Sequence, residues 1–310
     1  MKLKLVCLAL LSLLLGCGEE TSSDLSLALN WFPEAEHGGY YSAQVEGHFE
    51  KQSLKVNIIS GGPDAPVIQK VATGRAAYGI ANADDVLNAR ANGAKIIAVF
   101  APIQINPRCI MVHEDSGIKS FEEIKNITLG MSARPAFSHW LKTKVKLEGV
   151  KVVPYPPSIS IFLNDPKFAQ QAYNISEPFV AQKLGAKPKV LMVSDLGFNP
   201  YCSVLITTEE RLAKEPDEVK KFVEASKAGW LDYLKKPDLS HREIHRLNPE
   251  MPLDVLDFGA NKLKSMTETK GALEFGEMTE ERWLELSGQM KAAGLIDLKP
   301  EEVKKAWLNL

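Results

Sequence analysis

Residues 25–62 read LSLALNWFPEAEHGGYYSAQVEGHFEKQSLKVNIISGG and combine two kinds of hydrophobic repeat. In residues 25–29 leucine occupies every second position, which is typical of a strand. In residues 41–49 apolar side chains recur every four positions, as on one face of a helix, and residues 54–60 return to a strand pattern. A strand, a helix and a second strand in this order predict an open parallel sheet flanked by helices.

The same alternation continues along the chain, with helical stretches between the strands. Ser120 and Glu123 form a capping-box pattern that begins a second series, which repeats the architecture of the first without obvious sequence identity. Two α/β lobes are therefore expected. The further strands are predicted at residues 78–81, 95–101, 127–131, 150–154, 172–174 and 190–193.

The last third of the chain is predicted to be helical. Residues 219–234 and 283–293 each carry one apolar stripe at helical spacing, with several aromatic side chains. Because large apolar residues on such stripes usually form core, we assign these stripes to packing rather than to a ligand. We expect these helices to pack mainly against the first lobe.

Length and charge limit the classes of protein to consider. The 310 residues suggest about two domains, and 37 Lys and Arg against 39 Asp and Glu leave a formal charge of -2. These values argue against a basic nucleic-acid binder, and the 45% hydrophobic content argues against a multi-span membrane protein. They do not separate an enzyme from a binding protein.

The first residues have the pattern of a secretory signal peptide. Lys2 and Lys4 precede an uncharged run of twelve residues, which is too short to cross a membrane. The run ends in LLGC, which resembles the lipobox of bacterial lipoproteins and implies a lipid on Cys17; an ordinary signal peptide is the alternative. We therefore predict a signal peptide at residues 1–16 and a flexible tether at residues 17–24.

Neither cysteine pairing nor a metal site follows from the sequence. Cys109 and Cys202 could form one disulfide in an exported protein or remain as two buried thiols. His241 and His245 are four residues apart, but the glutamate of a zincin motif is misplaced, so we assign them to a surface turn. We predict no metal, no cofactor and no catalytic residue.

Candidate ligand contacts come from the segments that follow the predicted strands, because ligands of open α/β sheets bind at that edge. Asp84 could instead cap a helix, Gly62 could belong to a simple turn, and His37 and Tyr40 could be buried structural groups. The predicted contacts are Trp31, His37, Tyr40, Gly62, Asn82, Asp84, Asp85, Arg134, Tyr155, Glu177 and Tyr201.

The residue types in these segments favour one class of ligand. Aromatic side chains provide planar apolar surface, and the acids Asp84, Asp85 and Glu177 accept hydrogen bonds. A small oxyanion would need converging donors and a cation, for which Arg134 is the clear candidate. The balance favours a neutral or cationic heteroaromatic such as an aminopyrimidine, with an anionic substituent still allowed by Arg134.

Several of these segments resemble one superfamily. LNWFP at residues 29–33, with His37 and YYSAQVEGHF at residues 40–49, resembles the opening of substrate-binding proteins related to thiamine-pyrimidine synthases. TGRAAYG at residues 73–79 and SEPF at residues 176–179 are similar to its recurrent elements. That superfamily includes receptors of ABC importers for pyrimidine precursors, sulfonates and nitrate.

The resemblance implies a type II periplasmic-binding-protein fold, with two lobes that are each a mostly parallel sheet flanked by helices. Lobe 1 would comprise residues 25–112 and 205–310, and lobe 2 residues 113–204. The crossover strands would be residues 109–114 and 202–208. It also implies a monomer that closes on a small ligand and delivers it to an ABC permease. The lipobox resemblance adds that this protein is anchored through Cys17 in the bacterial cell envelope.

The rival reading is an enzyme, because the same superfamily contains pyrimidine synthases. These carry a CCCFC motif, where this chain reads FNPYCSVL and retains only Cys202. In ungapped comparison Ala81 and Asp85 occupy the positions of their lysine and histidine. Without those reactive groups pyridoxal chemistry lacks its amine, so we favour a pyrimidine-type receptor, then an anion receptor, then a synthase.

Overall fold

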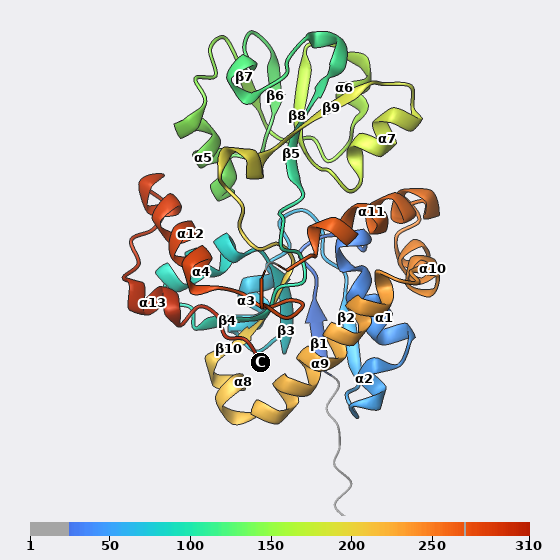
Figure 1. The fold of residues 1–310 in the computed structure, drawn as a ribbon, viewed down its shortest axis with the longest axis vertical. Coiled ribbons are helices and arrows are strands. Elements are labelled where there is room, and N and C mark those ends of the chain that lie inside the picture. Colours follow the sequence, from blue (N-terminus) through green and yellow to red (C-terminus); the bar gives the residue numbers. More distant parts are fainter. Residues whose placement is uncertain (1–24, 270) are drawn as a thin grey trace, which may run out of the picture.

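The structure is a computed structural model that describes residues 25–269 and 271–310. The signal peptide predicted at residues 1–16, the lipidated Cys17 and the tether at residues 17–24 lie outside the described residues. Among the helices that are described, none is both long enough and apolar enough to span a bilayer. Two lobes, one above the other in Figure 1, are joined by two connecting segments.

The first lobe is built on a five-stranded sheet in the order β2-β1-β3-β10-β4. The first three of these strands are mutually parallel, whereas β10 runs antiparallel to both of its neighbours. The strands are β1 (Leu25–Ala28), β2 (Val56–Ile59), β3 (Tyr78–Ala81), β4 (Ile96–Phe100) and β10 (Val204–Thr208).

Helices from both ends of the chain cover this sheet (Figure 1). The early helices are η1 (Ala35–His37), α1 (Gly38–Val45), α2 (His48–Lys51), α3 (Val67–Ala72) and α4 (Ala83–Ala91). The late helices are α8 (Glu209–Lys214), α9 (Pro216–Tyr233), α10 (Asp238–Leu247), α11 (Leu253–Met266), α12 (Glu280–Ala292) and α13 (Pro300–Lys304). The chain end returns to β4, where the Ala98 amide donates to the Ala306 carbonyl at 2.9 Å.

The predicted aromatic stripe of α9 lies in the core of the first lobe. Tyr78 stacks on Phe222 with ring centroids 3.8 Å apart, and Trp230 meets Tyr40 edge to face at 5.8 Å. All four side chains are fully buried, so this stripe packs the lobe and leaves no surface for a ligand. The packing role predicted from its helical spacing is confirmed.

The second lobe carries another five-stranded sheet, in the order β7-β6-β8-β5-β9. Its central strand β8 pairs parallel to β6 and antiparallel to β5. The strands are β5 (Arg108–His113), β6 (Thr128–Gly130), β7 (Lys151–Val153), β8 (Phe168–Tyr173) and β9 (Pro188–Met192). The helices are η2 (Glu114–Ser116), η3 (Phe121–Glu123), α5 (Ala136–Lys144), α6 (Ser160–Asn164), α7 (Glu177–Lys183) and η4 (Val193–Leu196).

The connections between the lobes differ from those expected. Residues 109–114 and 202–208 were predicted as crossover strands, but β5 lies within the second sheet and β10 within the first. Since β5 pairs with β8 and β9, the first connection ends before Arg108 rather than at residue 112. The two connections touch at an isolated antiparallel bridge between Ile103 and Cys202.

The two described cysteines are free and buried, so no disulfide joins them. Cys109 lies on β5 in the second lobe, where its thiol donates to the Ala172 carbonyl at 3.4 Å. Cys202 lies at the end of the second connection, between the lobes. The sequence left open either a disulfide or two buried thiols, and the structure shows two buried thiols.

Candidate functional site

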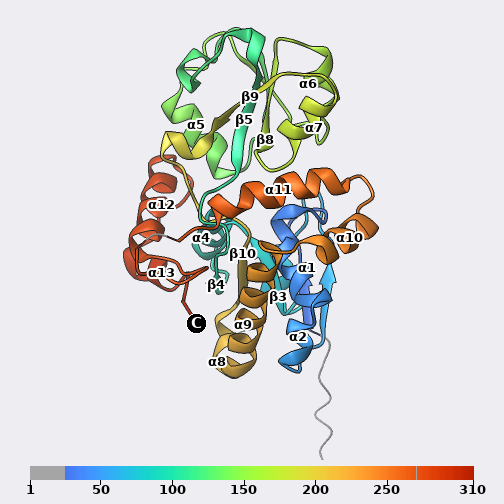
Figure 2. The ribbon, with the colours of Figure 1, turned by 45° about the vertical axis from the view of Figure 1, so that its right-hand side comes forward.

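A cleft lies where the two sheets face each other across the connections, and its side chains come from both lobes. The cavity between the lobes is lined by Asn82 and Asp84, which follow β3 of the first lobe, and by Arg108 and Phe137 of the second. Figures 1 and 2 show how the two lobes are arranged around the connections. The aromatic pair Phe179 and Phe258 joins the lobes, because these rings of α7 and α11 stack with centroids 4.5 Å apart. The ion pair of Lys183 with Asp254 reinforces this contact between the lobes at 2.5 Å.

Five carboxyl groups gather around this cleft. Glu34 and Glu36 come from the segment before α1, Asp84 and Asp85 from the start of α4, and Glu177 from the start of α7. Burial raises the pKa of Glu34 well above its usual value, and the charges of Glu36 and Glu177 add to this shift. The cleft is therefore acidic, with acids of both lobes close enough to affect one another.

Glu36 is one of two buried acids that the sequence reading did not select. Its side chain is 1% exposed, and its Oε2 accepts a hydrogen bond from Ser203 Oγ at 3.0 Å. Burial raises the pKa of Glu36 to about 7, although that hydrogen bond and the charge of Arg108 oppose the shift. The only sequence signal was the repeated acid in PEAEH, which does not reveal burial.

This shift predicts how the Glu36→Gln variant changes stability with pH. An unfolded glutamate titrates near a pKa of about 4.3, so between that pH and 7 the folded state keeps a proton that the unfolded state releases. Ionisation of Glu36 thus destabilises the wild type as pH rises, by on the order of 3 kcal/mol in full. The free energy of unfolding of the variant, measured with urea and expressed relative to wild type, should rise by about 2 kcal/mol between pH 5 and pH 8.

Glu148→Gln is the matched control for this prediction, because Glu148 is exposed and lies in the segment before β7. Its stability relative to wild type should stay constant over the same pH range. A Glu36→Gln difference that is flat or shrinks with rising pH would contradict the assignment of a buried, protonated Glu36.

His37 and Tyr40, both predicted ligand contacts, are instead buried in the first lobe. The His37 side chain is fully buried, its Nε2 lies 2.9 Å from Asn30 Oδ1, and its Nδ1 accepts from the Glu34 amide at 3.4 Å. Burial lowers the pKa of His37 to about 3, so the ring is neutral. Tyr40 donates from its hydroxyl to the Ser203 carbonyl at 3.1 Å. Tyr40 thus links the first lobe to the second connection, and the hydrogen bonds of His37 stay within the first lobe.

At the start of α4 the helix cap and the residue that lines the cavity are different residues, Asn82 and Asp84. Asn82 is the N-cap residue, and its amide donates to Asp85 Oδ2 at 3.2 Å in a capping box. Asp84, which could have been the cap, is therefore free of that role and is 8% exposed. Burial and the charge of Asp85 raise the pKa of Asp84 to about 7 against the effect of Arg108.

Tyr155 and Glu177, two predicted contacts of the second lobe, are joined by a hydrogen bond between their side chains. Glu177 Oε1 accepts from the Tyr155 hydroxyl at 3.1 Å, and its Oε2 accepts from the Tyr173 amide at 2.9 Å and from Ser176 Oγ at 2.6 Å. The carboxylate thus ties the loop after β7 to the end of β8. It orders this wall of the cleft through three hydrogen bonds.

Four other predicted contacts lie at the margin of the cleft or outside it. Arg134 is 93% exposed and lies 3.9 Å from Asp64 of the first lobe, so it is a rim residue. The Tyr201 hydroxyl accepts from the Thr279 amide at 2.9 Å, and its ring packs under Arg282, away from the cleft. Gly62 is buried in a turn beside Phe32, and Trp31 is partly exposed, edge to face with Phe32 at 5.7 Å.

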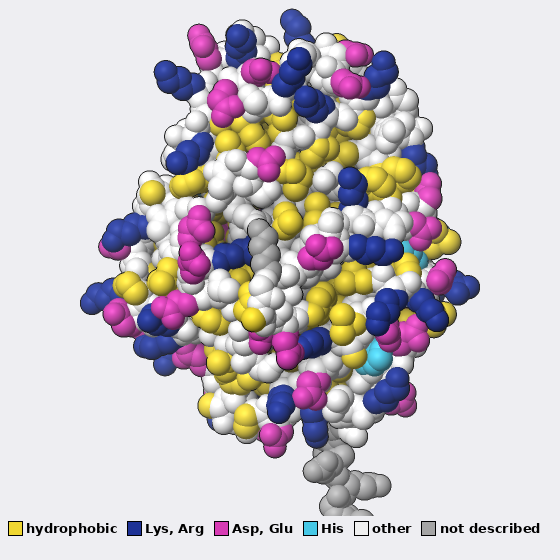
Figure 3. Space-filling model, in the orientation of Figure 1, with side chains coloured by type: hydrophobic (Ala, Val, Ile, Leu, Met, Phe, Trp, Pro, Cys, Tyr) yellow, Lys and Arg dark blue, Asp and Glu magenta, His cyan; other side chains and the backbone are white. Residues whose placement is uncertain are grey.

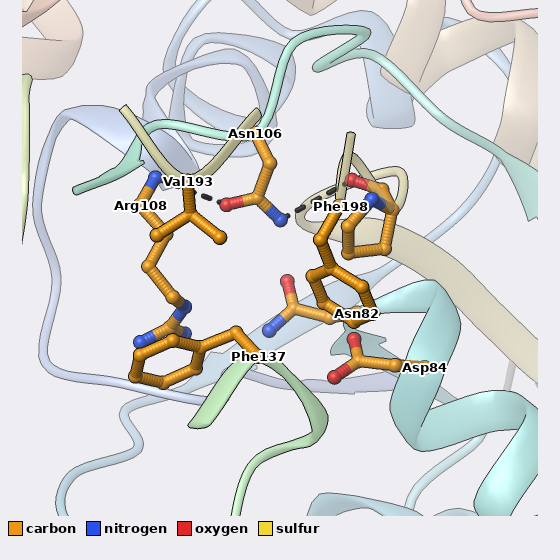
Figure 4. Close-up of a pocket in the computed structure, with 8 residues that line it drawn as sticks. Asn82, Asp84, Asn106, Arg108, Phe137, Val193 and Phe198 are labelled. Atoms are coloured by element: carbon orange, nitrogen blue, oxygen red, sulfur yellow. Dashed lines mark hydrogen bonds between the residues drawn. The ribbon is translucent and has the colours of Figure 1, made fainter. Parts of the chain in front are cut away.

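A small cavity of about 10 Å³ lies at the deep end of the cleft, next to the connections. Figure 4 shows Asn82 and Asp84 of the first lobe and Arg108 and Phe137 of the second around it. Arg108 was missed at the sequence level because it begins a strand, whereas candidates were taken from segments that follow strands. Arg108 lines this cavity, whereas Arg134 does not.

Neither a metal site nor an activated nucleophile is evident in the described residues. Within residues 25–269 and 271–310 no group of three His, Cys, Asp or Glu side chains could hold a metal ion. Burial raises the pKa of the Cys202 thiol, and the charge of Glu36 adds to the shift, so the thiolate is disfavoured. His241 bonds Asp257 Oδ1 at 2.8 Å and the Tyr233 hydroxyl at 3.1 Å, which is a structural role.

Comparison with known proteins places the chain among binding proteins and synthases. A family model described as NMT1/THI5 like matches residues 34–240. The riboflavin-binding protein RibY of Chloroflexus aurantiacus is 23% identical over 307 residues, covering 94% of this chain and 86% of that protein. The formylaminopyrimidine-binding protein of Halalkalibacterium halodurans is 24% identical over 250 residues, covering 76% of each chain.

A pyrimidine phosphate synthase and a sulphonate-binding protein are similar as well. The 4-amino-5-hydroxymethyl-2-methylpyrimidine phosphate synthase THI11 of Saccharomyces cerevisiae is 22% identical over 255 residues, covering 76% of this chain and 74% of the synthase. The structure of the periplasmic aliphatic sulphonate binding protein SsuA from Escherichia coli matches 91% of both chains with a TM-score of 0.67 and 15% identity. This structural similarity confirms the expected periplasmic-binding-protein fold.

Proposed function

The chain belongs to the NMT1/THI5-like family, and from this premise we propose that it is a monomeric solute-binding protein of an ABC importer. It binds a small heteroaromatic solute, such as a thiamine pyrimidine precursor, between its lobes. Closure of the hinge around the solute creates the form that the permease accepts. The relatives named for binding riboflavin and formylaminopyrimidine support this proposal.

The observation that carries the proposal is the mixture of acids and aromatic rings at the cleft. Asp84 and Asp85 belong to one lobe and Glu177 and Tyr155 to the other, so a bound solute meets acceptors from both sides. Carboxylates accept the N–H groups of an aminopyrimidine, and Trp31, in the segment that follows β1, offers a partly exposed aromatic surface. On the face in Figure 3 acidic and basic side chains are interspersed, which fits recognition by the cleft rather than by a charged surface.

A receptor for a sulfonate or nitrate is the second candidate, and the structure of the sulphonate-binding protein favours it at the level of the fold. The supply of cations argues against it. Arg134, the cation expected to neutralise an anion, is 93% exposed. An oxyanion in the cleft would therefore have one guanidinium, that of Arg108, to neutralise it.

We propose that the protein binds its solute without converting it. The synthase among its relatives keeps the enzymatic alternative open to test. A buried Cys202 with a raised pKa is a poor nucleophile, and Ala81 supplies no amine for a pyridoxal Schiff base. Turnover of a pyrimidine precursor with pyridoxal phosphate or iron would contradict this proposal.

We also propose export and a lipid anchor. The support is the pattern of Lys2, Lys4 and the apolar run before Cys17, which predicts cleavage at that cysteine and lipidation in the cell envelope. Radiolabelled palmitate should enter the wild-type protein expressed in bacteria. The Cys17→Ser variant should carry no label, and label in that variant would contradict the anchor.

A thermal-shift screen tests the proposed function. The chain from residue 18, which keeps every described residue, is screened against pyrimidines, flavin fragments, sulfonates and nitrate. Stabilisation by pyrimidines or flavin fragments supports the proposal, because a ligand that binds only the folded state raises the melting temperature. Stabilisation by sulfonates or nitrate alone would replace it with the anion receptor.

Trp31→Ala tests whether the aromatic surface of Trp31 contributes to affinity. Loss of the indole should weaken binding of the best heteroaromatic of the screen by about 10–100-fold, because stacked aromatic anchors supply much of the binding energy of such sites. Isothermal titration calorimetry measures this directly. Leu184→Ala, which removes an equally apolar but exposed side chain of the second lobe, should bind as wild type.

A further inference from the structure

Arg108 is a charged donor at the deep end of the cleft. It is the first residue of β5, and its guanidinium carbon lies 4.5 Å from the ring centroid of Phe137 and 4.9 Å from that of Tyr173. One hydrogen bond holds it, from Nη2 to the Tyr173 hydroxyl at 3.1 Å. Two aromatic rings therefore fix the plane of the guanidinium while its hydrogen-bonding capacity stays largely unused.

The described residues give this guanidinium no other partner. No carboxylate of residues 25–269 or 271–310 lies within 4.0 Å of it, and no second hydrogen bond from its side chain is found there. A guanidinium carries five N–H donors and remains charged in proteins. A partly buried charge with one neutral partner gains free energy from any acceptor placed before it.

The cavity that Arg108 faces also has an acceptor and a second donor. Asp84 lines it from the first lobe, as does Asn82, whose Oδ1 is used by the Ser203 amide at 3.3 Å and whose amide nitrogen has no described partner (Figure 4). Donors of Arg108 and Asn82 and an acceptor of Asp84 thus surround one space. A ligand group that fits must offer an acceptor beside a donor.

The size of the cavity selects among acceptors. About 10 Å³ is room for one water-sized atom. A single carbonyl oxygen fits this space. A neutral oxygen also places no negative charge beside Asp84, the carboxyl group that lines this cavity.

We propose that Arg108 binds a carbonyl oxygen of the solute and that Asp84 accepts the N–H next to that carbonyl. The solute is therefore a planar heterocycle with a C=O and N–H on one edge, as in a lactam or cyclic urea. This inference rests on the proposed function, and it makes Arg108 a determinant of specificity at the cleft. Because the two residues belong to different lobes, the same edge of the solute bridges them on closure.

Cytosine and 4-aminopyrimidine are the matched probes. Both carry the 4-amino group, but only cytosine has a carbonyl with an adjacent ring N–H. Calorimetric titration of the chain from residue 18 should show cytosine binding at least about 10-fold more tightly, since a hydrogen bond to a charged group contributes about that factor. In Arg108→Gln this ratio should fall to about 1, and in Arg134→Gln, which removes the exposed rim arginine, it should stay at the wild-type value.

The ratio distinguishes recognition from general damage, because a merely destabilised variant weakens both probes alike. If Arg108→Gln does not fold, Arg108→Lys keeps the charge without the planar fork and should lower the ratio to an intermediate value. Equal binding of both probes to wild type overturns the inference and leaves the proposed function intact. Failure of both probes also overturns it, and the thermal-shift screen then decides the proposed function independently.

Discussion

Alanine at position 229 is expected to disrupt the first lobe. Gly229 lies in α9 where it crosses α1, and a Cβ there would lie 2.4 Å from the Ala43 amide nitrogen and 2.4 Å from the Gly39 carbonyl oxygen. Both atoms belong to backbone, so the clash is relieved only if the two helices move apart and loosen the aromatic core. We expect a loss of about 3 kcal/mol or more in the free energy of unfolding.

Gly288→Ala is the matched control, because Gly288 also lies within a long helix, α12, and a Cβ there would meet nothing within 4 Å. Alanine loses less conformational freedom on folding than glycine, so this variant should be stabilised by about 0.5–1 kcal/mol. Urea denaturation of both variants measures the contrast. A Gly229→Ala variant as stable as wild type would show that the two helices are not in close contact.

Glu177→Ala is expected to weaken solute binding by about 10–100-fold and to lower stability. The substitution removes the acceptor of three hydrogen bonds and leaves the Tyr155 hydroxyl and the Tyr173 amide without partners, each at a cost of about 1–3 kcal/mol. The loop after β7 then loses its link to β8, and the cleft wall loses its order. Calorimetric titration with the best heteroaromatic of the screen measures the change.

Two further variants separate this role from general destabilisation. Glu177→Gln keeps one acceptor oxygen for the Tyr155 hydroxyl and should restore part of the affinity. Glu148→Ala removes an exposed acid of the same lobe and should bind as wild type. If Glu177→Ala binds normally, the three hydrogen bonds do not position the solute.

Sequence periodicity predicted where the strands lie better than how far they extend. β2 occupies Val56–Ile59 within the predicted residues 54–60, but β8 spans Phe168–Tyr173, and residues 172–174 alone were predicted. Gln170 and Gln171 hide the strand, since polar side chains break the apolar pattern although both are buried in the sheet. The Gln171 side chain is satisfied by the distant Ser132 amide at 2.8 Å, a contact that no local pattern reveals.

The candidate site also contains residues that the sequence predicted and residues that it missed. The rule that ligands bind beyond the carboxyl ends of strands selected Asp84, Asp85 and Glu177, and of these Asp84 lines the cavity between the lobes; their role as ligand contacts stays a prediction. It missed Arg108 because β5 runs antiparallel to β8, so the amino end of β5 lies at that same edge. It also selected Arg134 rather than Arg108. The exposure of Arg134 depends on how the two lobes are placed relative to each other, and the sequence does not reveal this.

The sequence by itself determined two α/β lobes, the helical return to the first of them, and the segments that approach the cleft. These follow from hydrophobic spacing and helix caps, which are local properties of the chain. Tertiary structure alone decided that His37 and Tyr40 are core, that Glu36 holds a proton near neutral pH, and that Arg108 faces Asp84. Burial depends on the whole fold, and some partners, such as Glu36 and Ser203, are more than a hundred positions apart, so these contacts exist only in the folded chain.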